Sequence, residues 1–220
     1  YIYTTNYDKQ KIKKMGFHPK KIISIGKVPT HAPFRQQKTF RLFRKLNLQD
    51  KYDAYIIAGD WAMAGAFHNK PNIWYVHSPI REIWDLYKYT RKTIVSWWQR
   101  PLFDAWVVFH RFFNRFFVTH VTRVVCNSKN TATRVKKYLH RRARVIYPPI
   151  QTTKFTSKKH KNYWLSVNRL MMHKRVGMQL AAFKELPEEK LIIVGSFEQS
   201  RHFKKYASKI KKQKPKNVEI

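Results

Sequence analysis

The chain has 220 residues, with 46 Lys and Arg against 12 Asp and Glu, so its formal net charge is +34. Hydrophobic residues make up 43% of it and aromatic residues 15%, which excludes a disordered basic tail, because such tails lack large apolar side chains. The single cysteine, Cys126, excludes a disulfide framework, and no apolar run approaches the ~20 residues that a membrane-spanning helix needs.

Short apolar runs predict five buried strands in the first part of the chain. Their nearly continuous β-branched and aromatic residues are typical of strands that are covered on both faces. The runs are residues 21–25, 54–58, 73–76, 123–126 and 144–147. Helices are predicted between them, at residues 79–89, 101–118 and 129–140. Strands that alternate with helices indicate an α/β fold with a doubly wound parallel sheet.

Pro148 and Pro149 predict a domain boundary near residue 150. Proline fixes φ and restricts the residue before it, so helices and central strands end there. A polar, lysine-rich stretch follows up to residue 162. A strand at 164–170, a helix at 176–186 and a strand at 191–194 then predict one βαβ unit, and residues 217–220 resemble the opening of a further strand. We therefore predict a first α/β domain over residues 1–150 and a second that begins at 151.

The charge favours anionic partners, such as nucleic acid, an anionic membrane face or phosphorylated small molecules. It is spread along the chain, without a separate basic tail, so it is equally compatible with a basic surface kept for solubility. The sequence contains no zinc-finger spacing, RNP-like motif or basic heptad region. A basic nucleic-acid-binding α/β protein therefore stays the alternative function.

Residues 97–117 contain nine aromatic side chains with three arginines among them. The spacing of Phe109, Phe112, Phe113 and Phe116 follows one helix face, which predicts packing into the core. The same composition is typical of a peripheral membrane surface, where aromatic rings lie at headgroup level and arginines meet anionic lipid. Both interpretations hold if one face of the helix packs inward. Single-stranded nucleic acid is a weaker third interpretation, because stacking platforms usually lie on open sheet faces.

Two places carry residues suited to chemistry, whereas motifs for metal sites, serine hydrolases and P-loops are missing from the sequence. His77 directly follows a predicted strand, and in doubly wound sheets ligands bind at the carboxyl ends of strands. A hydrogen-bonded loop histidine is the competing interpretation. Arg169 and Lys174 flank a strand-to-helix turn, where the free N–H groups of the helix favour an anion such as a diphosphate. The competing interpretation is surface charge on a very basic protein.

Seven stretches of the chain, taken in order, resemble the retaining glycosyltransferases of family 4, which have the GT-B fold of two Rossmann-like domains. The resemblance is greatest to the mannosyltransferase-type members. The stretches are YTTNYDKQ (3–10), YDAYIIAGDWA (52–62), IWYVHSPIREIWDLY (73–87), VVCNSKNTATRVKKYL (124–139), RVIYPPI (144–150), WLSVNRLMMHKRVGMQLAAFKEL (164–186) and KLIIVGSF (190–197).

The resemblance implies roles for particular residues. Arg169 and Lys174 match the family's pair that holds the donor diphosphate, and His77 matches the catalytic histidine that faces the donor sugar. Trp84 and Asp85 lie near that edge and are expected to contact sugar or acceptor. The family is generally metal-independent, so no metal or cofactor is expected, and GDP-mannose is the expected donor substrate.

The resemblance also implies partners and missing parts. A hexose would pass to a lipid-linked or polysaccharide acceptor, and the enzyme would be cytoplasmic, peripheral on the anionic cytoplasmic face of the membrane, with nucleic acid not expected as a partner. Tyr1 and Ile220 do not look like natural ends. The family's first strand with its glycine-rich loop, and its paired glutamates, are therefore expected outside residues 1–220. The second domain, 151–220, would be truncated and the fragment by itself inactive.

Overall fold

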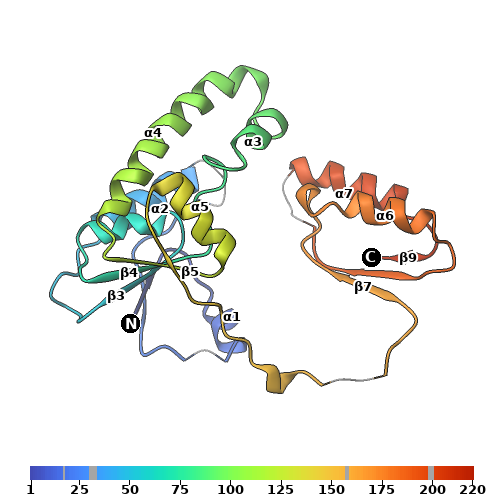
Figure 1. The fold of residues 1–220 in the computed structure, drawn as a ribbon, viewed down its shortest axis with the longest axis horizontal. Helices are drawn as coiled ribbons and strands as arrows, with labels where there is room; N and C mark the ends of the chain where they lie inside the picture. The colour runs from blue at the N-terminus through green and yellow to red at the C-terminus, as the bar shows by residue number, and fades with distance from the viewer. Residues whose placement is uncertain (17, 30–33, 157–158, 198–200) are drawn as a thin grey trace. The chain divides into compact units, whose positions relative to one another are not determined.

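The computed structural model describes residues 1–16, 18–29, 34–156, 159–197 and 201–220. The chain forms two compact units, Tyr1–Ile150 (unit 1) and Gln151–Ile220 (unit 2), drawn in Figure 1. Each unit has its own cluster of buried apolar side chains.

Unit 1 contains two parallel sheets. The larger one has the strand order β3 (Tyr55–Ala58), β4 (Asn72–Val76), β5 (Arg123–Cys126), β6 (Arg144–Val145), and all its neighbours are parallel. The smaller one pairs β1 (Ile2–Thr4) with β2 (Ile22–Ser24), also in parallel. Parallel strands joined by helices confirm the predicted α/β class.

The helices of unit 1 cover the apolar residues of its strands. Trp74 and Val76 of β4 are buried in one cluster with Phe117 of α4 and Val135 of α5. The helical segments are α1 (Lys9–Lys14), α2 (Phe34–Lys45), η1 (Ala62–Phe67), α3 (Tyr87–Thr93), η2 (Trp97–Gln99), α4 (Arg100–Thr119) and α5 (Lys129–Leu139). The side chain of Ser128 accepts a hydrogen bond from the N–H of Thr131, which confirms Ser128 as the N-cap of α5.

The predicted helix at 79–89 is wrong over most of its length. Residues 81–86 form turns, and α3 begins at Tyr87. The N–H groups of Trp84 and Leu86 both donate to the Arg81 carbonyl, at 3.2 and 2.8 Å, in place of a helical ladder. The turns bury Ile80, Ile83 and Trp84 together in the core. Burial of these three side chains therefore overrides the helical pattern.

Unit 2 is a three-stranded parallel sheet with the order β7 (Trp164–Val167), β8 (Leu191–Val194), β9 (Val218–Glu219). Its helical segments are η3 (Thr152–Lys154), η4 (Met172–Lys174), α6 (Val176–Lys184) and α7 (Arg201–Gln213). The predicted βαβ unit and the strand near the end are confirmed.

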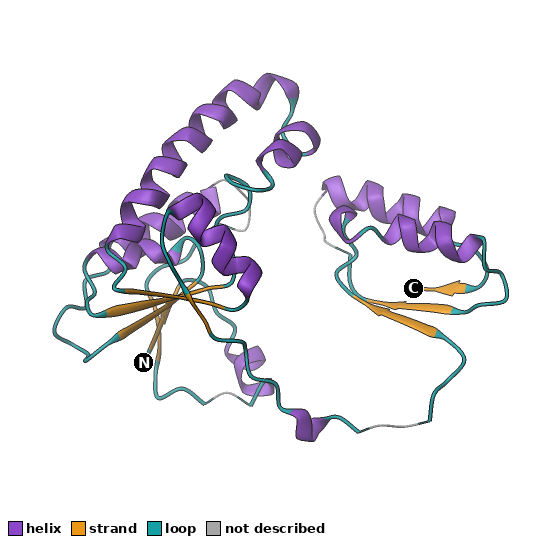
Figure 2. Ribbon diagram, in the orientation of Figure 1, coloured by secondary structure: helices purple, strands orange, loops and turns teal. Residues whose placement is uncertain are grey.

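Among the described residues of unit 2, none covers one face of its sheet. Figure 2 shows α6 and α7 on the same side of the three strands, where Leu191 and Ile193 are buried with residues of both helices. On the other side, Leu165, Val167 and Val194 are 57%, 70% and 51% exposed. Parallel sheets are normally covered on both faces, so this apolar surface is unusual.

Candidate functional site

The carboxyl ends of β3, β4 and β5 meet at one edge of the larger sheet, because the strands are parallel neighbours. Chemically active side chains follow directly after these ends: Asp60 after β3, His77 after β4 and Ser128 after β5. This edge is where an open α/β sheet binds its ligands.

His77 is held by its backbone and displays its side chain. Its carbonyl accepts a hydrogen bond of 3.2 Å from the buried hydroxyl of Thr131 in the first turn of α5. The Tyr75 ring meets the imidazole edge-on, at 5.2 Å between centroids. The residue itself is exposed. The imidazole therefore lies at the sheet edge in a fixed backbone setting, with its ring open to a ligand.

Asp60 belongs to the same edge, and the sequence reasoning did not select it. Burial raises the pKa of its carboxyl group to about 6, and the negative charge of Glu82 adds to this, against a backbone hydrogen bond and Arg134. A carboxyl group in this state exchanges protons near neutral pH. The signal was present in the sequence, because Asp60 follows a strand and a glycine just as His77 follows a strand.

Asp85 joins the turns after β4 to α5. One carboxylate oxygen accepts from Arg81, at 2.9 and 3.1 Å, and the other accepts from Arg134, at 2.5 Å. Both oxygens are therefore occupied by arginines, and Asp85 fixes the position of these two cations. Arg134 is the one of the two whose charge lowers the pKa of Asp60.

Trp84 is 9% exposed and packs inside the unit. Its indole N–H donates to Asn114 at 3.0 Å, its ring stacks on Tyr138, and the Arg111 and Arg115 guanidinium groups lie 5.2 and 5.1 Å from the ring centroid. In this arrangement the indole supports the turns that carry Asp85, and it presents little ring surface to a ligand.

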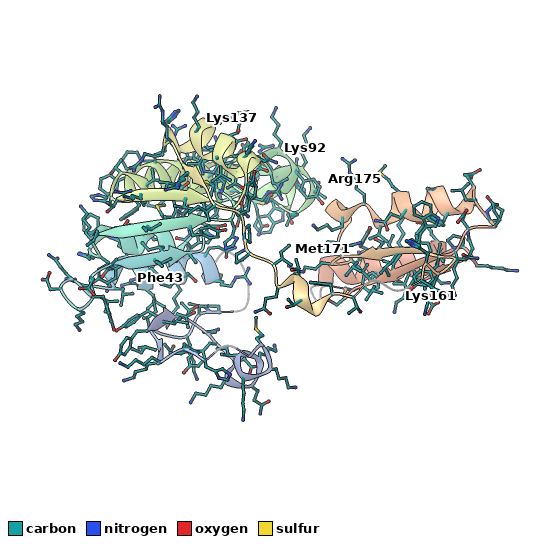
Figure 3. The ribbon with its side chains drawn as sticks, turned by 60° about the horizontal axis from the view of Figure 1, so that its bottom comes forward. Phe43, Lys92, Lys137, Lys161, Met171 and Arg175 are labelled. Carbon is teal, nitrogen blue, oxygen red and sulfur yellow. The ribbon has the colours of Figure 1, made fainter. Side chains whose placement is uncertain are left out.

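Arg169 and Lys174 lie on the loop between β7 and α6, at the carboxyl end of the unit 2 sheet, and both are exposed. Figure 3 labels Met171 and Arg175 of the same loop, at one end of this unit. The loop is fixed to the one after β8: the N–H of Asn168 donates to Val194 and that of Leu170 to Ser196, both at 3.1 Å. Both cations therefore lie at the carboxyl edge of a parallel sheet, beside the strand-to-helix turn where the sequence predicted them.

The backbones of the loops after β7 and β8 come very close together at Gly195. A Cβ atom at Gly195 would lie 1.8 Å from the carbonyl oxygen of Asn168, which no side chain tolerates. Glycine at 195 therefore lets the two loops run side by side and holds the backbone between Arg169 and Lys174 in place.

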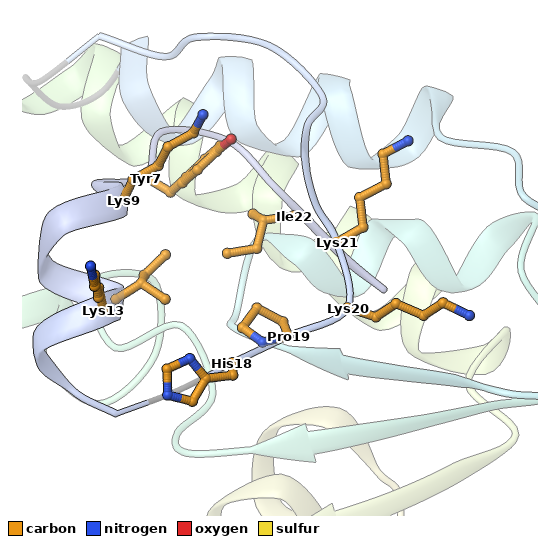
Figure 4. A pocket seen from close by; sticks show the side chains of 9 residues that line it. Tyr7, Lys9, Lys13, His18, Pro19, Lys20, Lys21 and Ile22 are labelled. Atoms are coloured by element: carbon orange, nitrogen blue, oxygen red, sulfur yellow. The ribbon is translucent and has the colours of Figure 1, made fainter.

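A basic cavity of about 430 Å³ lies elsewhere in unit 1. Figure 4 shows its lining, which includes Lys9, Lys13, Lys20 and Lys21. The lining residues belong to α1 and its flanking segments, and none comes from the β3–β5 edge. Over the described ranges, no group of three or more His, Cys, Asp or Glu residues is placed to hold a metal ion.

Comparison with protein-family models matches residues 1–154 to the family described as Glycosyltransferase Family 4. The match spans all of unit 1, including the edge that carries Asp60 and His77, and the first residues of unit 2. No curated protein matches the chain.

Proposed function

Because the chain belongs to glycosyltransferase family 4, we propose that it is a retaining hexosyltransferase that uses a nucleotide sugar, with GDP-mannose as donor and a lipid-linked or polysaccharide acceptor. The glycosidic bond to the donor diphosphate breaks, and a bond from the anomeric carbon to an acceptor oxygen forms on the same face of the sugar. The released nucleoside diphosphate takes the bonding electron pair and the proton that the acceptor hydroxyl loses.

Unit 1 is assigned to the acceptor and the donor sugar, and unit 2 to the nucleotide diphosphate. The observation that carries this assignment is His77, exposed at the carboxyl edge of a parallel sheet that lies within the family match. An imidazole there can donate a hydrogen bond to a sugar hydroxyl and orient the ring as charge develops on the anomeric carbon.

Arg169 and Lys174 are proposed to bind the donor diphosphate. Two cations beside the start of α6 offset the charge that builds up on the leaving group as the bond to the sugar breaks. They supply positive charge at the place where other transferases use a metal ion, so the proposed reaction is metal-independent.

Asp85 and Trp84 are proposed to act where the acceptor binds. Asp85 acts through Arg81 and Arg134, which it binds at 2.9 and 2.5 Å, and these cations suit an acceptor that carries phosphate. Trp84 holds the turns that carry Asp85 through its contacts with Asn114 and Tyr138.

Replacement of the diphosphate pair tests the proposal. In the complete protein, Arg169→Ala and Lys174→Ala are expected to slow release of GDP from GDP-mannose by about 100-fold each, as for the loss of other charge-stabilising groups. The assay follows the labelled nucleoside diphosphate that is released, GDP from GDP-mannose or UDP from the comparison donor UDP-glucose.

Lys184→Ala is the matched control, because Lys184 is an exposed cation in the last turn of α6. It is expected to keep the wild-type rate. Near-normal rates in Arg169→Ala and Lys174→Ala would remove both residues from the donor site, and equal rates with UDP-glucose would reject the mannose donor.

A further inference from the structure

Helix α4 has two faces with different surroundings. Its inward face is buried in unit 1 and contains Val107, His110, Asn114, Phe117 and Val118. Its outward face is apolar and open. Leu102, Phe109, Phe112 and Phe116 are 75%, 55%, 65% and 43% exposed. The spacing 102, 109, 112, 116 places them on one side of the helix. The predicted core packing of Phe109, Phe112 and Phe116 is therefore wrong, whereas Phe113 packs against the core. The membrane interpretation of the aromatic stretch stays a prediction.

The apolar surface continues into the segment before α4. Trp97 and Trp98 of η2 are 77% and 65% exposed. We call these two residues, with Leu102, Phe109, Phe112 and Phe116, the outer face. An exposed patch of this kind marks an interaction surface.

Cations border the outer face. Helix α3, which precedes Trp97 and Trp98 in the chain, packs on α4 through Tyr87, stacked at 6.0 Å on Phe103. Helix α2 packs on the buried side of α4, with the Phe40 ring 5.2 Å from that of Phe117. The exposed cations of α3 are Lys88 and Lys92, and those of α2 are Arg35, Lys38, Arg41, Arg44 and Lys45; Figure 3 labels Lys92 and, on α5, Lys137.

Negative charge is nearly missing from the same helices. Asp104 is the single acidic residue in the sequences of α2, α3 and α4. Arg91 binds it at 2.9 Å and the Tyr87 hydroxyl at 2.8 Å, so its charge is already balanced. The border of the outer face along α3 is therefore positive, and the three helices together carry a large positive charge.

We propose that the outer face docks on an anionic lipid bilayer, with its rings at headgroup level and the bordering cations on lipid phosphates. Tryptophan and phenylalanine beside lysine and arginine are the composition that such an interface favours. A second copy of the chain would bring two positive borders together, which charge repulsion opposes. None of the described helices is long and apolar enough to cross a membrane.

This docking stands on α4 and its neighbours and does not depend on the transfer reaction. It would bring the enzyme to the bilayer that carries a lipid-linked acceptor. Docking and chemistry also use different residues, because no residue of the outer face is among those that directly follow the carboxyl ends of β3, β4 and β5.

Vesicle binding tests the proposal. The complete protein is sedimented with phosphatidylcholine vesicles that do or do not contain phosphatidylglycerol. Tighter binding to the anionic vesicles, by about tenfold or more at low salt, is expected, with quenching of tryptophan emission by brominated lipid. The double variant Leu102→Gln/Phe112→Gln is expected to bind about tenfold or more weakly, because two exposed apolar side chains no longer enter the interface.

Matched variants separate the two contributions. Met178→Gln/Leu186→Gln replaces two apolar side chains of unit 2 that are 62% and 43% exposed, and it is expected to bind vesicles like the wild type. Lys88→Gln/Lys92→Gln is expected to weaken binding to anionic vesicles by about fivefold or more and to leave binding to neutral ones unchanged.

Three results would overturn the proposal. They are no binding to anionic vesicles at low salt, an equal loss in the Met178/Leu186 control, and a lipid-free dimer or an oligonucleotide complex that the Leu102/Phe112 variant abolishes. Release of GDP from GDP-mannose without vesicles is measured on the same variant. We expect this variant to keep its release of GDP and to lose vesicle binding. A wild-type protein that released no GDP would contradict the proposed function and leave the docking proposal unaffected.

Discussion

Asp60 and His110 are two titratable residues of unit 1 whose neutral forms are favoured. Burial raises the pKa of Asp60 to about 6 and lowers the pKa of His110 to about 4. His110 is 2% exposed, within 4.5 Å of the Trp106 ring, and its Nε2 lies 2.7 Å from the Gln37 amide nitrogen. A neutral ring suits this apolar setting, whereas an imidazolium would not be solvated there.

The two residues give stability opposite dependences on pH. Between about pH 4 and 6, folded Asp60 keeps a proton that the unfolded chain releases, so its contribution to stability falls as pH rises. Unfolded His110 takes up a proton below about 6.5 that the folded ring refuses, so its contribution falls as pH falls from 6.5 to 4. The two contributions to the pH dependence of stability partly cancel between about pH 4 and 6.

The variant Asp60→Asn should separate the pH dependence of stability that is due to Asp60 from the one that is due to His110. At pH 7 it is expected to raise the free energy of unfolding by about 2 kcal/mol, because a charge that burial disfavours is removed. Its stability should then decline more steeply than that of the wild type from pH 6.5 to 4, with the His110 contribution uncompensated. Urea unfolding over this pH range measures both effects.

Asp53→Asn, at an exposed position of the same unit, serves as the control and should change little. A less stable Asp60→Asn at pH 7 would mean that Arg134 stabilises the Asp60 charge more than burial disfavours it.

At the site, the sequence pattern selected residues by their place after strands, and the roles of these residues stay predictions. His77, Arg169 and Lys174 all lie where a carboxyl strand end was predicted. The sequence could not show that Trp84 is buried against Tyr138, because residue 138 lies on a helix distant in the chain. The displaced pKa of Asp60 depends on packing from several segments, which no local pattern reports.

At the scale of elements, the paired loops after β7 and β8 depend on Gly195. Gly195→Ala is expected to destabilise unit 2 by about 3 kcal/mol, because the new Cβ would lie 1.8 Å from backbone oxygen and the loops must separate. Hydrogen exchange of the β8 amides measures the loss directly.

Gly177→Ala is the matched control within the same unit. Its Cβ would meet the Ile210 side chain at 3.8 Å, an ordinary contact. Alanine favours a helix over glycine, so this variant should be up to about 1 kcal/mol more stable. Equal effects of the two substitutions would contradict the close approach of the loops.

Elements with a continuous apolar run were predictable, and elements stabilised by distant contacts were not. The strands β3, β4, β5 and β8 fall on their predicted runs, and α4 matches its predicted helix within a residue at each end. Helix α2 has no buried residue and owes its place to contacts such as Phe40 with Phe117. The sequence analysis predicts no helix for the lysine-rich α7, whose Ile210 is buried in the unit 2 core.

At the scale of the molecule, the two separate cores predict two protease-resistant units. The stretch 151–162, at the start of unit 2, is exposed wherever its side chains are described. Trypsin is therefore expected to cut first there, after Lys159 or Lys161, and to leave one fragment that ends at residue 159 or 161 and one that begins at residue 160 or 162. Mass spectrometry of the early fragments checks this, and a first cut within residues 1–150 or after residue 162 would contradict it.

The exposed apolar face of the unit 2 sheet affects how copies of the chain associate in solution. A net charge of +34 makes copies of the chain repel one another, which keeps the bare Leu165, Val167 and Val194 surfaces apart in dilute buffer. The range of that repulsion shrinks from about 30 Å at 0.01 M salt to about 3 Å at 1 M. Added salt therefore lets these faces meet and draws copies together, so the preparation that best preserves single molecules is one of low ionic strength.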